Sequence, residues 1–309
     1  MMRRNYILII LLIIVSTMTV EGQSFERYKN KFRNDQQRHG QWVILGGLGT
    51  SSYMGDLKDS EFSLDAKPNV IIGAKYRYKT HLSFRSEFTW YRIAGNDANQ
   101  PLESGLPSRN LSFRADNFEI NVAGLLHAFP RYKNRRDMSN LPVNPYVFLG
   151  VGVTSNNPTA EYEGNRYNLR GLQTQGYHYS GAAVVIPFGI GLDFRINDKF
   201  DIGVEGGYRY TFSDQLDDSS RPDIVNPDLF ASPIAKALSD RRNEVGIIPG
   251  TPPYSGSIRG NPKNKDSYFL MSLKVQYYMQ MTGLRRAKYQ GPKDYSTTFK
   301  GNMKRRKRR

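Results

Sequence analysis

Apolar and polar residues alternate with a period of two along several stretches of the chain, which is the pattern of a β-strand with two unlike faces. In the clearest stretch, Phe200 and Ile202 share one face while Asp201 and Glu205 share the other. The pattern predicts eight strands, near Trp42–Tyr53, Pro68–Lys79, Leu82–Trp90, Phe118–Ala128, Pro145–Val153, Ile186–Ile196, Lys199–Phe212 and Phe269–Tyr277. The first is the least regular, because its glycines interrupt the alternation.

Alternation alone does not say which face points inward, and a soluble eight-stranded carrier would enclose the apolar face. The connections between the predicted strands favour a membrane barrel. Those after the second and sixth strands are short and that after the fourth is moderate, whereas those after the first, third, fifth and seventh are long. Aromatic residues near the strand ends favour it too, as belts at the lipid head groups: Tyr53, Tyr76, Tyr78, Trp90, Tyr91, Tyr210, Tyr277 and Tyr278. We therefore predict an all-β fold, an eight-stranded antiparallel transmembrane β-barrel with long extracellular loops and a basic C-terminal tail.

The polar faces carry charges of both signs, separated by glycines. Small and charged side chains together are expected to fill a narrow barrel interior with paired ions rather than leave an open pore. The residues predicted to form this interior ion network are Arg77, Arg85, Glu87, Glu119, Asp193, Arg195, Glu205 and Arg209. Lys75, Asp201 and Lys274 lie on the same polar faces.

The N-terminus predicts export. Arg3 and Arg4 precede an apolar run, Tyr6–Val15, and small and polar residues follow up to Gly22. This is the order of a secretory signal peptide, and the run is shorter than the ~20 residues that a membrane helix needs. We predict a signal peptide over 1–22, a periplasmic segment over 23–40, an outer-membrane barrel over 41–280 and a basic periplasmic tail over 281–309. Short turns normally face the periplasm, which places both termini there and the four long loops outside.

The net charge of +16 is concentrated at the C-terminus. The tail from Met281 onward holds eleven Lys or Arg residues and a single acid, Asp294. A basic tail on an exported chain argues against nucleic acid as a partner. An acidic protein, anionic lipid or the cell wall are open alternatives, and so is a solvated tail without a partner.

Candidate chemistry is sparse. The chain has no cysteine, which excludes disulfides and thiolate sites, and its histidines, His39, His81, His127 and His178, do not have metal-ligand spacing. The sequence predicts neither a cofactor nor an enzyme, although some barrels of this size modify lipids. Acids of the last long loop could bind calcium but fit a solvated acidic loop better: Asp214, Asp217, Asp218, Asp223 and Asp228.

Two blocks are too unusual to be generic barrel sequence. One is Gly47–Leu57, GLGTSSYMGDL, and the other pairs Tyr208–Asp218 with Ile258–Tyr278, IRGNPKNKDSYFLMSLKVQYY. With VNPDLF at Val225–Phe230, they make the chain resemble the PorG-like outer-membrane barrels of the Bacteroidetes type IX secretion system. The resemblance implies a component of a secretion and gliding machine that anchors a periplasmic PorK–PorN ring at the outer membrane, with outer-membrane lipid and the ring proteins as partners.

Two groups of residues follow from this interpretation. For an acidic periplasmic partner we expect contacts from Arg285, Arg286, Lys288, Lys304, Arg305, Arg306, Lys307, Arg308 and Arg309. We expect a loop motif to turn the chain back into the last strand without binding substrate, formed by Arg259, Gly260, Asn261, Pro262 and Asp266. The alternative function is a surface adhesin or ligand-binding barrel that acts through its extracellular loops.

Overall fold

The structure is a computed structural model that describes residues 40–57, 66–79, 81–100, 106–129, 143–197, 199–246, 259–261 and 265–279. The predicted signal peptide 1–22, residues 23–39 of the predicted periplasmic segment and the basic tail 281–309 lie outside the described residues. The domain boundaries that depend on them stay predictions.

Eight antiparallel strands form a closed barrel. They are β1 (Gln41–Met54), β2 (Lys67–Arg77), β3 (Leu82–Asn96), β4 (Ser112–His127), β5 (Val143–Ser155), β8 (Ala182–Arg195), β9 (Phe200–Thr211) and β10 (Ser267–Tyr278). Each pairs with its neighbours along the chain, and β1 pairs with β10, with Val43 opposite Tyr278, so the sheet has no free edge within the barrel. The predicted fold class is confirmed.

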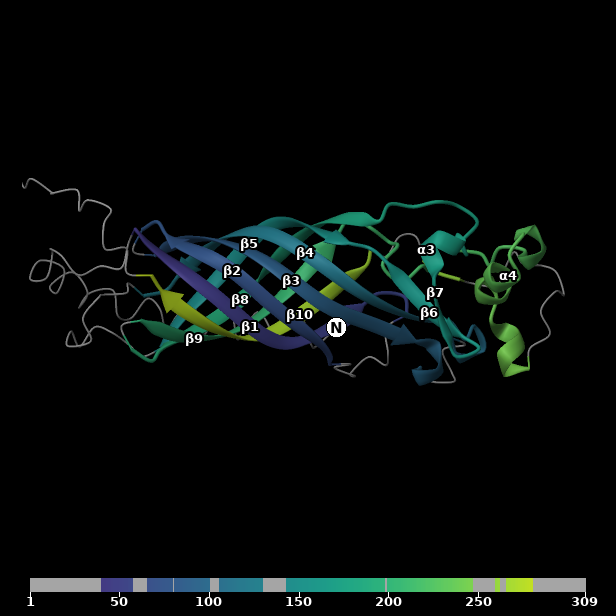
Figure 1. Cartoon of the computed structure of the whole chain (residues 1–309), viewed down its shortest axis with the longest axis horizontal. Helices are drawn as coiled ribbons and strands as arrows, with labels where there is room; N and C mark the ends of the chain where they lie inside the picture. Colours follow the sequence, from purple (N-terminus) through teal and green to yellow (C-terminus); the bar gives the residue numbers. More distant parts are fainter. Residues whose placement is uncertain are drawn as a thin grey trace, which may run out of the picture. The chain divides into compact units, whose positions relative to one another are not determined.

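The long connections carry their own secondary structure. A hairpin of β6 (Pro158–Tyr162) and β7 (Asn165–Asn168) leads into α3 (Leu169–Leu172), and α4 (Pro233–Ser239) lies between β9 and β10. Short 3-10 turns span Asp97–Asn99, Leu106–Ser108, Pro227–Leu229 and Arg242–Val245. Figure 1 shows β6, β7, α3 and α4 together at one end of the barrel, which we call the loop end. In the described part of the chain, no helix has the length and apolar character to cross a membrane.

The outer face of the barrel is apolar over most of its height. Large side chains that point outward from neighbouring strands are widely exposed, such as Ile120 at 58%, Leu149 at 63% and Ile190 at 68%. The inward residues that alternate with them, such as Glu119 and Asp193, are fully buried. A continuous exposed band of this kind is unfavourable in water and favourable in lipid, and a closed barrel satisfies its backbone hydrogen bonds without water. The fold is therefore that of a transmembrane barrel.

We call the end of the barrel opposite the loop end, where β1 and β9 begin, the turn end. Aromatic pairs border the apolar band there. Trp42 packs on Tyr76 with ring centroids 5.0 Å apart, and Phe200 packs on Tyr277 at 5.1 Å. The sequence-based belt was wrong for three residues, because Tyr53, Tyr91 and Tyr278 are buried and point into the barrel. A tyrosine at a strand end fits either face, since its ring is apolar and its hydroxyl can bind a buried polar group.

The polarity of the two faces inverts where β3 and β4 leave the membrane. In β3, the outward residue Trp90 is followed by outward Arg92, and the inward residue after Tyr91 is Ile93. In β4, Phe118 and Asp116 mark the same change on the outer face. Beyond this line the hairpin continues with Asn96 opposite Ser112, and β6 replaces β5 as the neighbour of β4. The predicted strands stopped near Trp90 and Phe118 because the hydrophobic phase reverses there.

Glycines on the inner face make room for large rings. A Cβ on Gly191 would lie 2.2 Å from Cζ of Tyr146, and one on Gly207 would lie 2.5 Å from Cζ of Phe148. The rings of Tyr146 and Phe148 on β5 therefore pack directly on the backbone of β8 and β9. This gives a structural reason for the glycines on the inner faces of those strands.

The larger of two buried apolar clusters lies at the loop end, and the smaller one joins β4 and β5 inside the barrel. Inward residues of the barrel rim, including Tyr53, Tyr91 and Tyr268, pack with Leu216 and Leu238 from the longest connection. We call this packed assembly of loops the loop cap, and its other buried members are Leu57, Ile93, Leu111, Phe113, Ala115, Ala160, Leu169 and Leu270.

Candidate functional site: an ion-filled interior under a loop cap

The middle layer of the interior is a network of charged residues from three strands, joined by a tyrosine from a fourth. The Nζ of Lys274 lies 2.6 Å from Oε1 of Glu87 and 2.7 Å from Oε1 of Glu205. Arg85 donates to both oxygens of Glu205 and lies 3.1 Å from Glu87. The hydroxyl of Tyr146 also donates to Glu205, at 2.7 Å. Charges removed from water are tolerated only when paired in this way, so the layer is a fixed part of the fold.

A second layer lies toward the turn end. Lys75 lies 3.4 Å from Asp193, and the amide of Gln276 donates to the same carboxylate at 2.6 Å. The hydroxyl of Tyr278 donates to Asp201 at 2.6 Å and accepts from Arg77 at 3.0 Å.

A third layer lies below the loop cap. The hydroxyl of Tyr268 donates to Glu119 at 2.6 Å, and Arg209 lies 3.8 Å from the same carboxylate. The ring of Tyr268 stacks on Tyr91 at 4.4 Å, and the hydroxyl of Tyr91 lies 2.6 Å from that of Thr154. From the turn end to the cap, the interior is thus occupied by interacting side chains.

The structure places all eight residues of the predicted ion network inside the barrel, each at most 7% exposed. It joins Arg85, Glu87 and Glu205 in one cluster, and it pairs Glu119 with Arg209 and Asp193 with Lys75. Among the described residues, Arg77 donates a hydrogen bond to the hydroxyl of Tyr278. The predicted network omitted the tyrosines that complete each layer, Tyr146, Tyr268 and Tyr278. Their only signal in the sequence is an inward position in the alternation.

The predicted loop motif lies in the loop cap. Arg259 is buried and donates to Oδ2 of Asp218 at 3.0 Å and to the carbonyl of Ser239 at 2.6 Å. Asp266 accepts from the backbone of Leu216 at 2.8 Å and from the hydroxyl of Tyr53.

Backbone contacts complete this motif. A Cβ on Gly260 would lie 1.5 Å from the carbonyl oxygen of Ser219, so only glycine fits there. The backbone of Asn261 donates to Asp56. Pro262 lies outside the described residues. Arg259 thus joins two parts of the last loop, and Asp266 ties that loop to Tyr53 of the barrel rim.

The prediction of a solvated acidic loop was wrong for three of its five acids. Asp214, Asp217 and Asp218 are buried, whereas Asp223 and Asp228 are exposed. Among the described residues, no group of carboxylates and histidines has the arrangement of a metal site.

Burial alters the acid–base behaviour of this part of the loop cap. It raises the pKa of Asp217 to about 7, and burial together with the charge of Asp217 raises the pKa of Asp214 to about 7. Burial and the charge of Asp217 also hold the pKa of Asp266 well above its usual range.

Two histidines and a serine are linked by hydrogen bonds at the turn end. Nε2 of His127 lies 3.2 Å from the hydroxyl of Ser83, and Nδ1 of His81 lies 2.9 Å from the carbonyl of His127. Ser83 and His127 are both buried, which gives a substrate no direct access to the pair. His178 belongs to the connection between β5 and β8 and lies far from them in the chain. The prediction that the protein is not an enzyme stays a prediction.

Several solved structures resemble this barrel at low similarity. Neisserial surface protein A is 11% identical, with a TM-score of 0.39 over 76% of this chain and 96% of that one. Ail of Yersinia pestis is 12% identical, with a TM-score of 0.37 over 78% and 99%. OprG, an outer membrane protein of Pseudomonas aeruginosa, is 10% identical, with a TM-score of 0.34 over 79% and 98%. No curated protein matches the sequence.

The strand order, the apolar outer band and the charged interior define the class: this is an eight-stranded transmembrane β-barrel of the outer-membrane type. Residues 32–229 match the family described as Domain of unknown function (DUF6089), and the chain belongs to that family.

Proposed function

We propose that this protein is a non-enzymatic, non-conducting outer-membrane anchor whose functional surfaces lie at the two ends of the barrel. The observation that carries the proposal is the ion-filled interior, where Lys274, Glu87 and Glu205 form a buried cluster across the barrel. Each of these charges is neutralised by a neighbour, so the interior lacks the hydrated surface that solutes need for passage. The proposed function therefore depends on the surfaces at the turn end and the loop end.

Connection lengths support an orientation in the outer membrane. At the turn end, β2 and β3 are joined by residues 78–81, β8 and β9 by residues 196–199, and β4 and β5 by the longer connection 128–142. At the loop end, the connections span 55–66, 97–111, 156–181 and 212–266. Short turns on the periplasmic side and long loops outside are the usual arrangement in bacterial barrels. In this orientation both termini, and with them the basic tail, are periplasmic.

The motifs around Gly47–Leu57 and Ile258–Tyr278 support a more specific role. In the type IX secretion system that they suggest, the barrel positions the PorK–PorN ring at the outer membrane, with the basic tail as contact for an acidic surface of the ring. The buried positions of Arg259 and Asp266 give one of these motifs a structural reason, because Arg259 binds Asp218 within the longest loop and Asp266 binds Tyr53 of the barrel rim.

The test is a full-length variant in which the nine basic residues assigned to the partner are replaced by glutamine. Ring subunits should no longer co-purify after mild detergent extraction, and export of type IX cargo should fall, while the barrel still inserts. The control, Lys236→Gln, removes an exposed positive charge at the loop end and should leave both readouts unchanged. Normal co-purification and export by the tail variant would contradict the anchor role.

The loop cap favours a second candidate function, a surface adhesin. Leu216 and Leu238 pack on the barrel rim, so the cap presents a defined surface. Gly260→Ala tests this candidate, because its Cβ would collide with the carbonyl oxygen of Ser219 and disturb the cap above an intact barrel. Gly124→Ala, where a Cβ would meet nothing within 4 Å, is the control. Lost surface binding with normal secretion would favour the adhesin over the anchor.

A further inference from the structure

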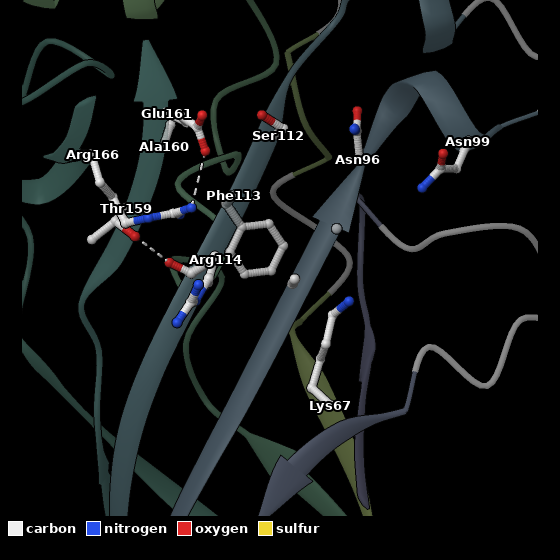
Figure 2. Close-up of a pocket in the computed structure, with 12 residues that line it drawn as sticks. Lys67, Asn96, Asn99, Ser112, Phe113, Arg114, Thr159, Ala160, Glu161 and Arg166 are labelled. Atoms are coloured by element: carbon white, nitrogen blue, oxygen red, sulfur yellow. Dashed lines mark hydrogen bonds and ion pairs between the residues drawn. The ribbon is translucent and has the colours of Figure 1, made fainter. Parts of the chain in front are cut away.

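A polar cleft of about 260 Å³ opens on the outside of the loop end, between the β3–β4 hairpin and the β6–β7 hairpin. Figure 2 shows Lys67, Asn96 and Asn99 on one side of it and Arg114, Thr159, Glu161 and Arg166 on the other, with Phe113 between them. Its volume lies just below the roughly 300–1,000 Å³ of sites for drug-sized ligands, so it suits a smaller group.

The charges around the cleft favour an anion. Asp116 is shared by two guanidinium groups, at 2.6 Å from Nε of Arg92 and 3.2 Å from Nη2 of Arg114. Glu161 pairs with Arg166 at 3.2 Å, and Lys67 adds a further cation. Cations therefore outnumber acids here. Arg114 lines the cleft, and its side chain is 34% exposed, so part of its guanidinium group is accessible from the cleft. Guanidinium groups suit phosphate, which they can bind through two parallel hydrogen bonds.

The neutral lining favours a sugar. Two amides, Asn96 and Asn99, and two hydroxyls, Ser112 and Thr159, border the same space. Side chains that both donate and accept hydrogen bonds match the hydroxyl groups of a saccharide. The small residues Ala94, Gly95 and Ala160 leave room for the ring.

The position of the cleft points to the source of such a ligand. Trp90 is the last outward aromatic residue of β3, and Arg92 lies over its ring at 5.6 Å, which marks the edge of the hydrocarbon. Ala94, four residues beyond Trp90, lies roughly 10 Å further along the membrane normal for a strand of ordinary rise and tilt. A phospholipid head-group layer extends only about 5–8 Å. The sugars of an outer-leaflet glycolipid extend further.

We propose that this cleft binds a phosphorylated saccharide, supplied by the glycolipid head groups that surround the barrel. Arg114 and Lys67 bind the phosphate, and Asn96, Asn99 and Thr159 bind the sugar hydroxyls. The choice of the membrane as source depends on the proposed orientation with the loops outside; the ligand chemistry does not.

The test measures binding of lipopolysaccharide truncated to its phosphorylated inner core to the purified full-length barrel in detergent, by calorimetry and native mass spectrometry. Binding should be saturable, and Lys67→Gln with Arg114→Gln should weaken it by about tenfold or more, because two charge-assisted contacts are lost. Lys236→Gln, on α4, is the matched control and should bind normally. A heat-dependent shift in gel mobility verifies that each variant is folded.

Three further arms identify the source. Glucose 1-phosphate that binds as tightly as the glycolipid, with the same sensitivity to the double variant, would support the sugar-phosphate chemistry but assign it to a soluble ligand. Equal binding of dephosphorylated glycolipid, or of phosphatidylglycerol, would overturn the proposal, as would unchanged binding by the double variant. The readout uses isolated protein, so it does not depend on whether the protein serves secretion.

Discussion

At the scale of single residues, Glu205 is the acid on which the interior depends most. It accepts hydrogen bonds from Arg85, Lys274 and Tyr146, and all four side chains are buried. Glu205→Gln removes the charge that balances two buried cations, which costs about 3–5 kcal/mol for a buried pair. Urea unfolding in lipid vesicles should show this loss. Glu161→Gln, which breaks the exposed pair with Arg166, should cost less than about 1 kcal/mol. Equal effects would mean that the interior is hydrated.

The same scale predicts how the loop cap responds to pH. Asp214 and Asp217 have a pKa of about 7 in the folded cap, against an ordinary value of 3.8. Between these values the unfolded loop loses protons that the folded cap retains, so stability falls as pH rises. The loss of stability of the loop cap is complete above about pH 7, and no stability is lost below about pH 4. Hydrogen-exchange protection factors at Leu216 and Ser219 should therefore be lower at pH 8 than at pH 5. In Asp217→Asn the difference should shrink, and an unchanged difference would assign the effect to other groups.

At the scale of elements, each barrel strand has one face in contact with lipid and one face toward the polar interior. Leu149 on β5 is 63% exposed and Leu229 in the longest connection is 76% exposed, yet only Leu149 lies in the apolar band. Leu149→Arg should therefore cost about 2–4 kcal/mol of folding free energy in lipid vesicles, the cost of arginine near the bilayer centre. Leu229→Arg should have almost no effect, because it stays in water. Equal effects of the two substitutions would contradict a lipid-facing band.

At the scale of the whole molecule, the ionic layers and the loop cap predict a closed barrel. Purified protein in a planar bilayer should give no conductance steps, because Lys75, Arg85, Lys274 and Arg209 are held by acids or amides that span the interior. The protein is delivered to the planar bilayer by fusion of lipid vesicles that contain it, and protease protection of the barrel in those vesicles verifies insertion. Stable, reproducible steps from the inserted wild-type protein would refute the closed interior and the anchor proposal that relies on it.

The sequence by itself determined the barrel. Alternation places Ile190 outward and Asp193 inward independently of the loop conformations, because side chains of a strand point alternately to its two faces. In a membrane barrel one face contacts lipid and the other the polar interior. Alternation also identified the charged residues of the interior. Only the tertiary structure decided their partners, because Glu205 meets Arg85 across 120 positions of the chain. It likewise decided that Tyr278 faces inward and that Asp217 is buried. A tyrosine fits either solvent, and a loop acid is buried only when distant segments pack over it.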